Sequence, residues 1–289
     1  MPDFSDTSIA IIGVGLMGGS LGLAARERLD VRRVTGFSRT KRSLQQALDL
    51  GAITDKAGSV EEAVAGADIC FVATPVRSIL EVSRQAMAVS GQGCIFTDMG
   101  STKSNLMSSL SPAEEKHFIG GHPVCGSETA GVGNSREDLF DNATWFLTSG
   151  KGVEPSNYEK LHGFIAGVGA KPTAIDPDAH DRIMALVSHL PHVLANAAVN
   201  QVGSVNLDGR EALLSAGPSF SDLTRVAGSN PRVWTDIFME NRRWLGEALK
   251  EHITSMELIL QAVKSGDERF LKEMIAAAAG NRNRMLEAE

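Results

Sequence analysis

The sequence predicts an α/β protein in which a doubly wound, mainly parallel sheet is followed by an all-helical region. Two observations predict this fold class. From residue 8 to about residue 177, short apolar runs alternate with longer helix-like stretches, a pattern typical of βαβ units. After Pro177 the strand signals stop and only helical patterns remain.

Short apolar runs predict the strands of the sheet. They cover residues 9–12, 34–37, 69–73, 94–97, 118–120, 144–147 and 171–175. Helices are predicted between them, most clearly at residues 16–28, 41–51 and 78–90. Strands that alternate with helices in this way form a sheet that is covered on both faces.

The helical region is predicted to hold helices at residues 180–203, 207–216, 219–228, 231–265 and 266–288. We therefore divide the chain into residues 1–176, an α/β domain, and residues 177–289, a helical domain. Apolar residues recur at helical spacing along 231–265. This pattern favours a dimer-forming face over a helix that packs only within its own domain.

Composition indicates a soluble protein in which any anionic ligand has to be held by a local site. The chain has 289 residues, of which 43% are hydrophobic and 22% charged, and a net charge of −7. The acidic balance argues against a nucleic-acid partner. No signal peptide and no uninterrupted membrane-spanning run is evident. Three widely spaced cysteines fit a reduced cytoplasm better than a disulfide scaffold, so we expect a cytoplasmic protein.

A glycine-rich loop follows the first predicted strand and opens a helix. Gly13 permits a tight turn, Gly15 lets the backbone approach a pyrophosphate, and Gly18 lets helix and strand pack closely. Leu16 and Met17 complete the loop, and the N–H groups of the helix start face the phosphates. This context predicts a dinucleotide site of the Rossmann type.

The end of the second strand indicates which dinucleotide binds. An NAD site usually carries an acidic residue there, whereas this chain has Ser38, Arg39 and Thr40. Hydroxyls and a guanidinium suit a 2′-phosphate, so NADP is predicted over NAD. The alternative is that Arg39 and Arg42 are solvated charges at a helix start.

Two residues that follow later strands suggest oxidation of an alcohol. His122, in a Gly-Gly-His-Pro turn, is a candidate base for a hydroxyl proton. Ser101 could orient that hydroxyl, or it could cap a helix. Glu128 is a candidate supporting group for His122. These positions predict hydride transfer from a substrate alcohol to the nicotinamide.

The helical region adds polar residues for substrate. His189 and His192 stand three apart and could share a helical face, one as substrate ligand and the other as support. They lack a third ligand, so no metal site is predicted, and Pro191 between them suggests a kink. Arg225 is the candidate clamp for a substrate carboxylate, or else an ion-pair partner of Asp222 or of another acidic residue.

Taken together, these motifs resemble the prephenate/arogenate (cyclohexadienyl) dehydrogenases of tyrosine biosynthesis over nearly the whole chain. The segments that carry the resemblance are Gly13-Val14-Gly15-Leu16-Met17-Gly18, Ala73-Thr74-Pro75-Val76, Asp98-Met99-Gly100-Ser101-Thr102-Lys103, Gly121-His122-Pro123, Gly126-Ser127-Glu128, Ser188-His189-Leu190-Pro191-His192 and Asp222-Leu223-Thr224-Arg225. The resemblance implies a Rossmann domain, a helical dimerisation domain and a homodimer.

The resemblance also implies roles for single residues. His122 would take the proton of the ring hydroxyl, and Ser101 would position that hydroxyl and the cofactor. Arg225 would hold a carboxylate, and His192 would contact the substrate side chain, with Ser188 and His189 nearby. Cofactor contacts would include Thr74 and Pro75. Asp181, Glu128 and Trp234 would support the site.

The substrate would be arogenate, prephenate or both, and no residue decides between them. The chain reads Gly217-Pro218-Ser219 where the family often has a double glycine, which puts a contact from the partner subunit in doubt. Two alternatives remain. A β-hydroxyacid dehydrogenase would need a lysine within residues 176–200, which contain none. A nucleotide sensor without turnover would have no need of a base at His122.

Overall fold

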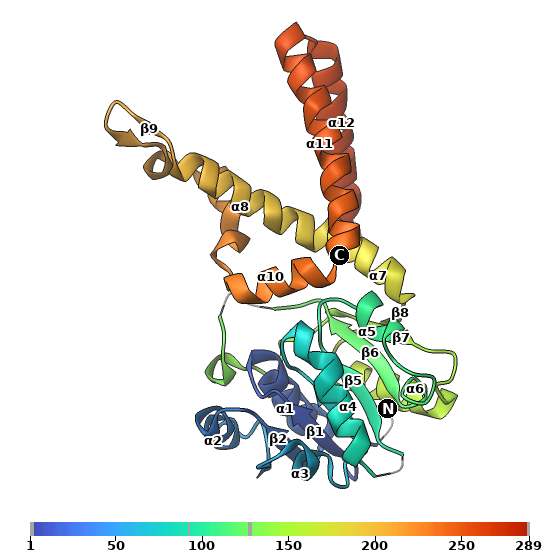
Figure 1. The fold of residues 1–289 in the computed structure, drawn as a ribbon. Coiled ribbons are helices and arrows are strands. Elements are labelled where there is room, and N and C mark those ends of the chain that lie inside the picture. The colour runs from blue at the N-terminus through green and yellow to red at the C-terminus, as the bar shows by residue number, and fades with distance from the viewer. Residues whose placement is uncertain (1–2, 92, 127–128, 288–289) are drawn as a thin grey trace. The chain divides into compact units, whose positions relative to one another are not determined.

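The computed structural model describes residues 3–91, 93–126 and 129–287 and confirms the predicted α/β class (Figure 1). In the described residues, eight strands form one sheet with the order β3-β2-β1-β4-β5-β6-β7-β8. Only β6 and β7 pair antiparallel; every other neighbouring pair in this sheet is parallel. The strands are β1(Ser8–Ile12), β2(Arg33–Phe37), β3(Asp55–Lys56), β4(Ile69–Val72), β5(Ile95–Asp98), β6(Phe118–Pro123), β7(Thr144–Ser149) and β8(Lys171–Ala174).

Alternate residues of β1 enter two different hydrophobic cores. Ile9 and Ile11 belong to one core, together with residues of α1 and α6, whereas Ala10 and Ile12 belong to the other, together with residues of α3 and α4. Because successive side chains of a strand point to opposite faces, helices cover both faces of the sheet. The helices of this part are α1(Leu16–Leu29), α2(Lys41–Asp49), α3(Val60–Val64), η1(Val76–Ser78), α4(Ile79–Val89), α5(Ser104–Ser108), η2(Val132–Asn134) and α6(Pro155–Gly167).

The remainder of the chain is helical apart from one small hairpin. Its elements are α7(Pro177–Met184), η3(Ala185–His189), α8(Leu190–Gly203), β9(Asn206–Leu207), β10(Arg210–Glu211), η4(Ala212–Ser215), α9(Pro218–Thr224), η5(Arg225–Gly228), α10(Pro231–Glu240), α11(Arg242–Ser265) and α12(Glu268–Leu286). The side chain of Asp176 caps α7 by accepting the N–H groups of Asp178 and Ala179, and Pro177 suits the first helical position.

A wide π-helical turn, η3, interrupts the predicted helix 180–203 just before Pro191. Proline has no N–H to offer the carbonyl one turn back, and π-turns occur mostly as single turns inside α-helices, frequently at functional sites. The predicted kink is therefore a widened turn, and it carries Ser188 and His189.

Two other helix predictions were wrong in detail. Residues 207–216 form the β9–β10 hairpin and the short helix η4, with Asp208 and Gly209 at positive φ in the turn. The predicted helix 231–265 is broken at Asn241, so that α10 and α11 are separate. The two-residue strand β3 was not predicted, because two residues are too short to show a strand pattern.

The run Pro177–Gly203 is long and apolar enough to cross a membrane, judged by length and composition alone. It nevertheless carries buried polar side chains, among them His180, Asp181, His189 and His192. Their hydrogen bonds within the protein are typical of a core helix of a soluble protein.

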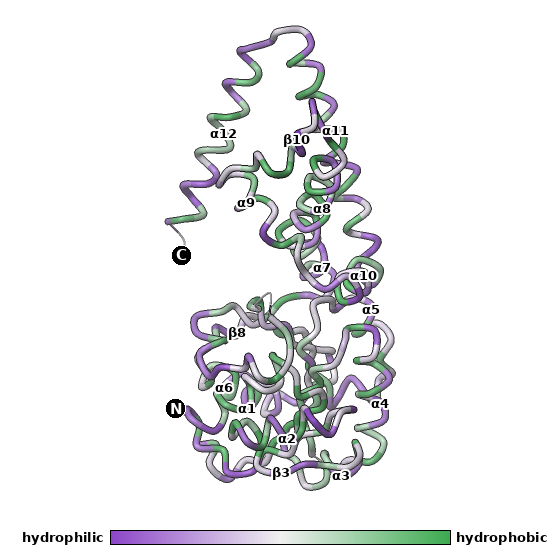
Figure 2. Tube along the Cα trace, turned by 90° about the vertical axis from the view of Figure 1, so that its left-hand side faces the viewer, coloured by the Kyte–Doolittle hydropathy of each residue, from purple (hydrophilic) through white to green (hydrophobic). Residues whose placement is uncertain are grey.

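The chain forms two compact units, Met1–Arg242 and Arg243–Glu289. The second unit comprises α12 and nearly all of α11, and both helices alternate between hydrophilic and hydrophobic residues along their length (Figure 2). None of the residues of α12 is buried. The functional division at residues 176 and 177 stays a prediction.

Candidate active site

Four predicted site segments lie at one edge of the sheet. Strands β1, β4, β5 and β6 run parallel, so their carboxyl ends meet at the same edge, where ligands bind in doubly wound sheets. Gly13 follows β1, Thr74 follows β4, and Ser101 follows β5. His122 lies near the carboxyl end of β6.

The three loop glycines have the environments that a dinucleotide loop requires. Gly13 has a φ of +102°, and a Cβ there would lie 2.5 Å from the carbonyl oxygen of Ala73. A Cβ on Gly18 would lie 2.4 Å from the carbonyl oxygen of Gly13. A Cβ on Gly15 would meet nothing within 4 Å. Two glycines are thus required by the fold itself, whereas Gly15 faces open space that a pyrophosphate could fill.

A cavity of about 540 Å³ lies beside this loop. Gly13, Gly15, Thr74 and Pro75 line it, together with Ser38 and Arg39 from the end of β2. The buried hydroxyl oxygen of Thr74 has no hydrogen-bond partner among the described residues. Leu16 and Met17 begin α1 and pack partly against the core. The unpartnered hydroxyl of Thr74, the open space at Gly15 and the N-terminus of α1 together fit a dinucleotide.

A second cavity, of about 780 Å³, shares Ser38 and Arg39 with the first. Lys41, Arg42 and Lys56 also line it, so four basic residues gather here. Thr40 lines neither cavity, and its hydroxyl donates to Ser43 over 2.6 Å. The basic lining suits an anionic group attached to whatever occupies the first cavity.

A buried ion pair stabilises the loop that carries Ser101. Lys103 Nζ lies 2.6 Å from Asp98 Oδ2, and neither side chain is exposed. Asp98 also accepts the N–H groups of Gly100 and Gly121. Ser101 is half-buried, and the residue that caps α5 is Lys103, not Ser101. The alternative role of Ser101 as a helix cap is therefore wrong.

His122 belongs to a chain of buried polar contacts. Its Nδ1 lies 2.8 Å from Nε2 of His180, and Nδ1 of His180 lies 2.8 Å from Oδ1 of Asp181. Asp181 accepts the backbone N–H groups of Lys103 and Ser104 over 2.7 and 2.8 Å. The start of α7 thus joins β6 to the Ser101 loop.

Asn241 continues this chain of contacts to the other predicted histidines. Its amide donates to the carbonyl oxygen of Asp181 over 2.7 Å and to Nδ1 of His189 over 3.1 Å. The ring of His189 meets Trp234 edge-on, and Trp234 stacks on His192 with ring centroids 3.6 Å apart. The structure therefore brings His122, Asp181, His189, His192 and Trp234 into one connected cluster.

Ser188 and Arg225 are the other predicted residues of the helical region. Ser188 is half-buried in η3. Arg225 is exposed and begins η5, which packs against α8, the helix that carries His192. Glu128 lies outside the described residues. No group of three or more potential metal ligands occurs in the described part of the chain.

Burial sets the charge of the cluster. It lowers the pKa of His122 well below the ordinary value, and electrostatic repulsion from His180, Lys103 and His189 in their protonated forms acts in the same direction. Burial likewise lowers the pKa of His180 and lowers that of His189 to about 4. Burial alone would raise the pKa of Asp181, but hydrogen bonds from His180, Ser104 and Lys103 lower it overall. At neutral pH the histidines are neutral and Asp181 is ionised.

Sequence reasoning missed His180, Asn241 and the Asp98–Lys103 pair. His180 directly precedes the predicted Asp181, so its position at a helix start was the available signal. Lysine is almost never fully buried unless it is paired, and nothing in the local sequence marks Lys103 as an exception.

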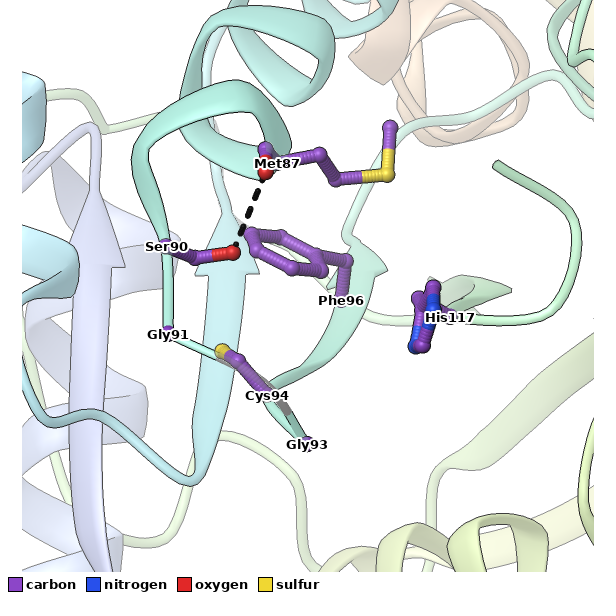
Figure 3. A pocket seen from close by; sticks show the side chains of 7 residues that line it. All are labelled: Met87, Ser90, Gly91, Gly93, Cys94, Phe96 and His117. Carbon is purple, nitrogen blue, oxygen red and sulfur yellow. Dashed lines mark hydrogen bonds between the residues drawn. The ribbon is translucent and has the colours of Figure 1, made fainter. Parts of the chain in front are cut away.

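A third cavity, of about 400 Å³, lies at the opposite edge of the sheet (Figure 3). Its lining includes Cys94 and His117, which immediately precede β5 and β6. Burial raises the pKa of the Cys94 thiol to about 12, which leaves it unreactive. This cavity is not part of the cluster around His122.

Comparison with known proteins places these features in a family. Residues 21–174 match the nucleotide-binding domain of prephenate dehydrogenase, and residues 176–277 match its dimerization domain. The chain belongs to the prephenate dehydrogenase family. It is 33% identical over 276 residues to a prephenate dehydrogenase of Bacillus subtilis, which covers 94% of this chain and 74% of the relative. It is 31% identical to a cyclohexadienyl dehydrogenase of Zymomonas mobilis, covering 92% of this chain and 91% of the relative.

Solved structures of the family agree with this fold. Prephenate dehydrogenase from A. aeolicus, in complex with hydroxyphenyl propionate and NAD+, superimposes with a TM-score of 0.90 at 28% identity, over 96% of this chain and 98% of that one. Arogenate dehydrogenase from Synechocystis gives a TM-score of 0.83 at 25% identity, over 96% and 99%. The protein is an NAD(P)-dependent oxidoreductase of this family, and the alternatives of a β-hydroxyacid dehydrogenase and a nucleotide sensor are set aside.

Proposed function

We propose that the protein is an NADP-preferring dehydrogenase that oxidatively decarboxylates arogenate, prephenate or both in tyrosine biosynthesis. One observation carries this proposal above the others. His122 is a buried imidazole at the carboxyl edge of the sheet, joined through His180 to an ionised carboxylate, at the same edge as the dinucleotide loop. A neutral imidazole in such a place suits a general base at physiological pH.

The proposed mechanism assigns one task to each residue. His122 takes the proton of the ring hydroxyl, and Ser101 orients that hydroxyl. Arg225 binds a substrate carboxylate, and His192, held flat against Trp234, contacts the substrate side chain together with Ser188 and His189. The nicotinamide cofactor, when bound, accepts the hydride. Loss of carbon dioxide then makes the ring aromatic, which drives the overall reaction one way.

The preference for NADP is supported by the two cavities beside β2. The first is lined by the glycine loop, and Ser38 and Arg39 line both it and the basic second cavity. We assign Ser38 and Arg39 to the 2′-phosphate, with Lys41, Arg42 and Lys56 as additional positive charge. Thr40 is the weakest member of the predicted set, because its hydroxyl is already bonded to Ser43.

A cytoplasmic homodimer is the proposed state of the protein. Helix α12 has no buried residue. Large apolar side chains are exposed on both helices: Ile275 of α12 is 62% exposed and Val263 of α11 is 60% exposed. Helices in proteins gain most of their stability from the packing of an amphipathic face, so a helix with no buried residue needs a partner. A second copy that covers α11 and α12 provides one, in keeping with the dimerization domain of the family.

Initial rates in a two-by-two grid test the function: prephenate or arogenate, each with NAD or NADP. We expect turnover that is faster with NADP, and the faster acid identifies the substrate. Preference for NAD would contradict the role of Arg39. No turnover in any of the four combinations would contradict the dehydrogenase itself.

A further inference from the structure

His122, His180 and Asp181 form an array in which two contacts of 2.8 Å each join neighbouring side chains. The three side chains are 8%, 0% and 1% exposed, respectively. Solvent therefore cannot supply partners at these two contacts, and the three nitrogens that form them must be matched by their neighbours in the array.

Asp181 determines the tautomer of His180. An ionised carboxylate only accepts hydrogen bonds, and Asp181 already accepts the N–H groups of Lys103 and Ser104. The imidazole nitrogen 2.8 Å from its Oδ1 must therefore carry a proton, so Nδ1 of His180 donates to Asp181. In a neutral ring this leaves Nε2 of His180 as an acceptor.

His180 in turn determines the tautomer of His122. Nδ1 of His122 faces the Nε2 lone pair of His180, so it must carry the proton and donate. The opposite tautomer would place two lone pairs 2.8 Å apart in a buried position. We propose that His180 is a positioning residue that fixes the proton of His122 on Nδ1 and thereby selects Nε2 of His122 as the base.

The surrounding charges agree with this assignment. The groups that act on the two rings are Asp98 of β5, Lys103 of the loop that follows it, Asp181 of α7 and His189 of η3. Lys103 is paired with Asp98, and Asp181 balances the array at its far end. When Nε2 takes a proton, the imidazolium keeps its Nδ1–H bond to His180, which in turn is anchored on the carboxylate. The O–H bond of the substrate breaks as the Nε2–H bond forms.

This inference rests on the proposed function for its meaning in catalysis, but the tautomer can be measured alone. The experiment is ¹⁵N NMR of the full chain labelled at histidine, with His122 assigned by comparison with His122→Asn. We expect a protonated Nδ1 and a bare Nε2 in His122 at neutral pH. A proton on Nε2 would overturn the proposal, whatever the enzyme does.

Two variants then connect the tautomer to the rate. In His180→Leu the acceptor is lost, and we expect mixed tautomers and a kcat lower by on the order of 10²-fold, with the substrate KM within about a factor of two. In His180→Gln the side-chain amide can accept from His122 and donate to Asp181, and most of the rate should return. His162→Leu, at an exposed histidine of α6, is the matched control.

The outcomes separate this inference from the proposed function. An unchanged tautomer and an unchanged kcat in His180→Leu would overturn the positioning role of His180. A wild-type protein that shows the expected tautomer but turns over neither acid would contradict the proposed function and leave the array intact.

Discussion

Lys103 Nζ lies 2.6 Å from Oδ2 of Asp98, and both side chains are completely buried. Lys103 also donates to the carbonyl oxygens of Gly100 and Thr102, while Asp98 accepts the N–H of Gly121, next to His122. One ion pair therefore ties the Ser101 loop to the strand of the candidate base. It determines the relative position of the two residues that are proposed to handle the substrate hydroxyl.

Removing one partner of this pair should be costly. We expect Lys103→Met to lower the free energy of unfolding by about 3–5 kcal/mol, because it leaves a buried carboxylate unpaired. Urea unfolding measures this change. The matched control is Lys160→Met, whose partner Asp68 lies 3.1 Å away, with both side chains more than a third exposed; it should cost less than about 1 kcal/mol. Equal costs for the two variants would contradict the structural role of Lys103.

The glycine loop offers a pair of substitutions with opposite consequences. Gly18→Ala places a Cβ 2.4 Å from the carbonyl oxygen of Gly13, so we expect it to destabilise the fold by about 1–3 kcal/mol. Gly15→Ala meets nothing within 4 Å, so its thermal midpoint should stay near that of the wild type while the cofactor KM rises about tenfold or more. A Gly15→Ala enzyme with an unchanged cofactor KM would show that the cofactor does not approach this loop.

The depressed pKa of His122 determines the acid limb of the rate profile. Because the folded pKa lies below 6.5, His122 remains an unprotonated base through neutral pH, and kcat/KM should fall only as the pH drops through that lower value. His122→Asn should reduce kcat on the order of 10²–10⁴-fold and remove this acid limb. His117→Asn, at an exposed histidine, should leave both unchanged. Retention of the limb in His122→Asn would assign it to another group.

Arg39 provides a test of the cofactor preference. We expect Arg39→Gln to raise the KM for NADP about 10–100-fold, since a charge-assisted hydrogen bond to phosphate contributes about 1.5–3 kcal/mol. The KM for NAD should change little, because NAD has no 2′-phosphate. Arg32→Gln, an exposed arginine that lines neither cavity, is the control. An equal effect on both cofactors would mean that Arg39 contacts a part common to the two.

The sequence allowed the fold class and much of the dinucleotide loop to be predicted, because both depend on local patterns. Apolar runs of three to five residues mark the buried strands. The spacing of the glycines indicates where two backbones approach closely. The same local view failed at residues 207–216. The Asp208-Gly209 pair is a hairpin signal, but leucines on either side of it also fit a helical pattern.

The sequence predicted a residue of the candidate site only where the residues next to it in the chain indicate its position. His122 lies near the carboxyl end of β6, and its neighbourhood in the sequence indicates its place at the sheet edge. His180 and Asn241 are 58 and 52 residues away from their respective histidine partners. Such contacts depend on how α7 and α10 pack in the folded chain, and this packing cannot be predicted from any single segment of the sequence.

The widened turn at residues 185–189 has a consequence for the direction in which side chains point. His180 and Asp181 precede this turn, while His189 closes it and His192 follows it. Each residue of an α-helix advances the side chain by about 100° around the axis, so the surplus residue of a π-turn changes the rotational phase of everything after it. Removal of one residue, such as Leu186, would leave the composition of the helix nearly intact and turn His192 away from Trp234. The chemistry of this helix depends on its angular phase as much as on which histidines it carries.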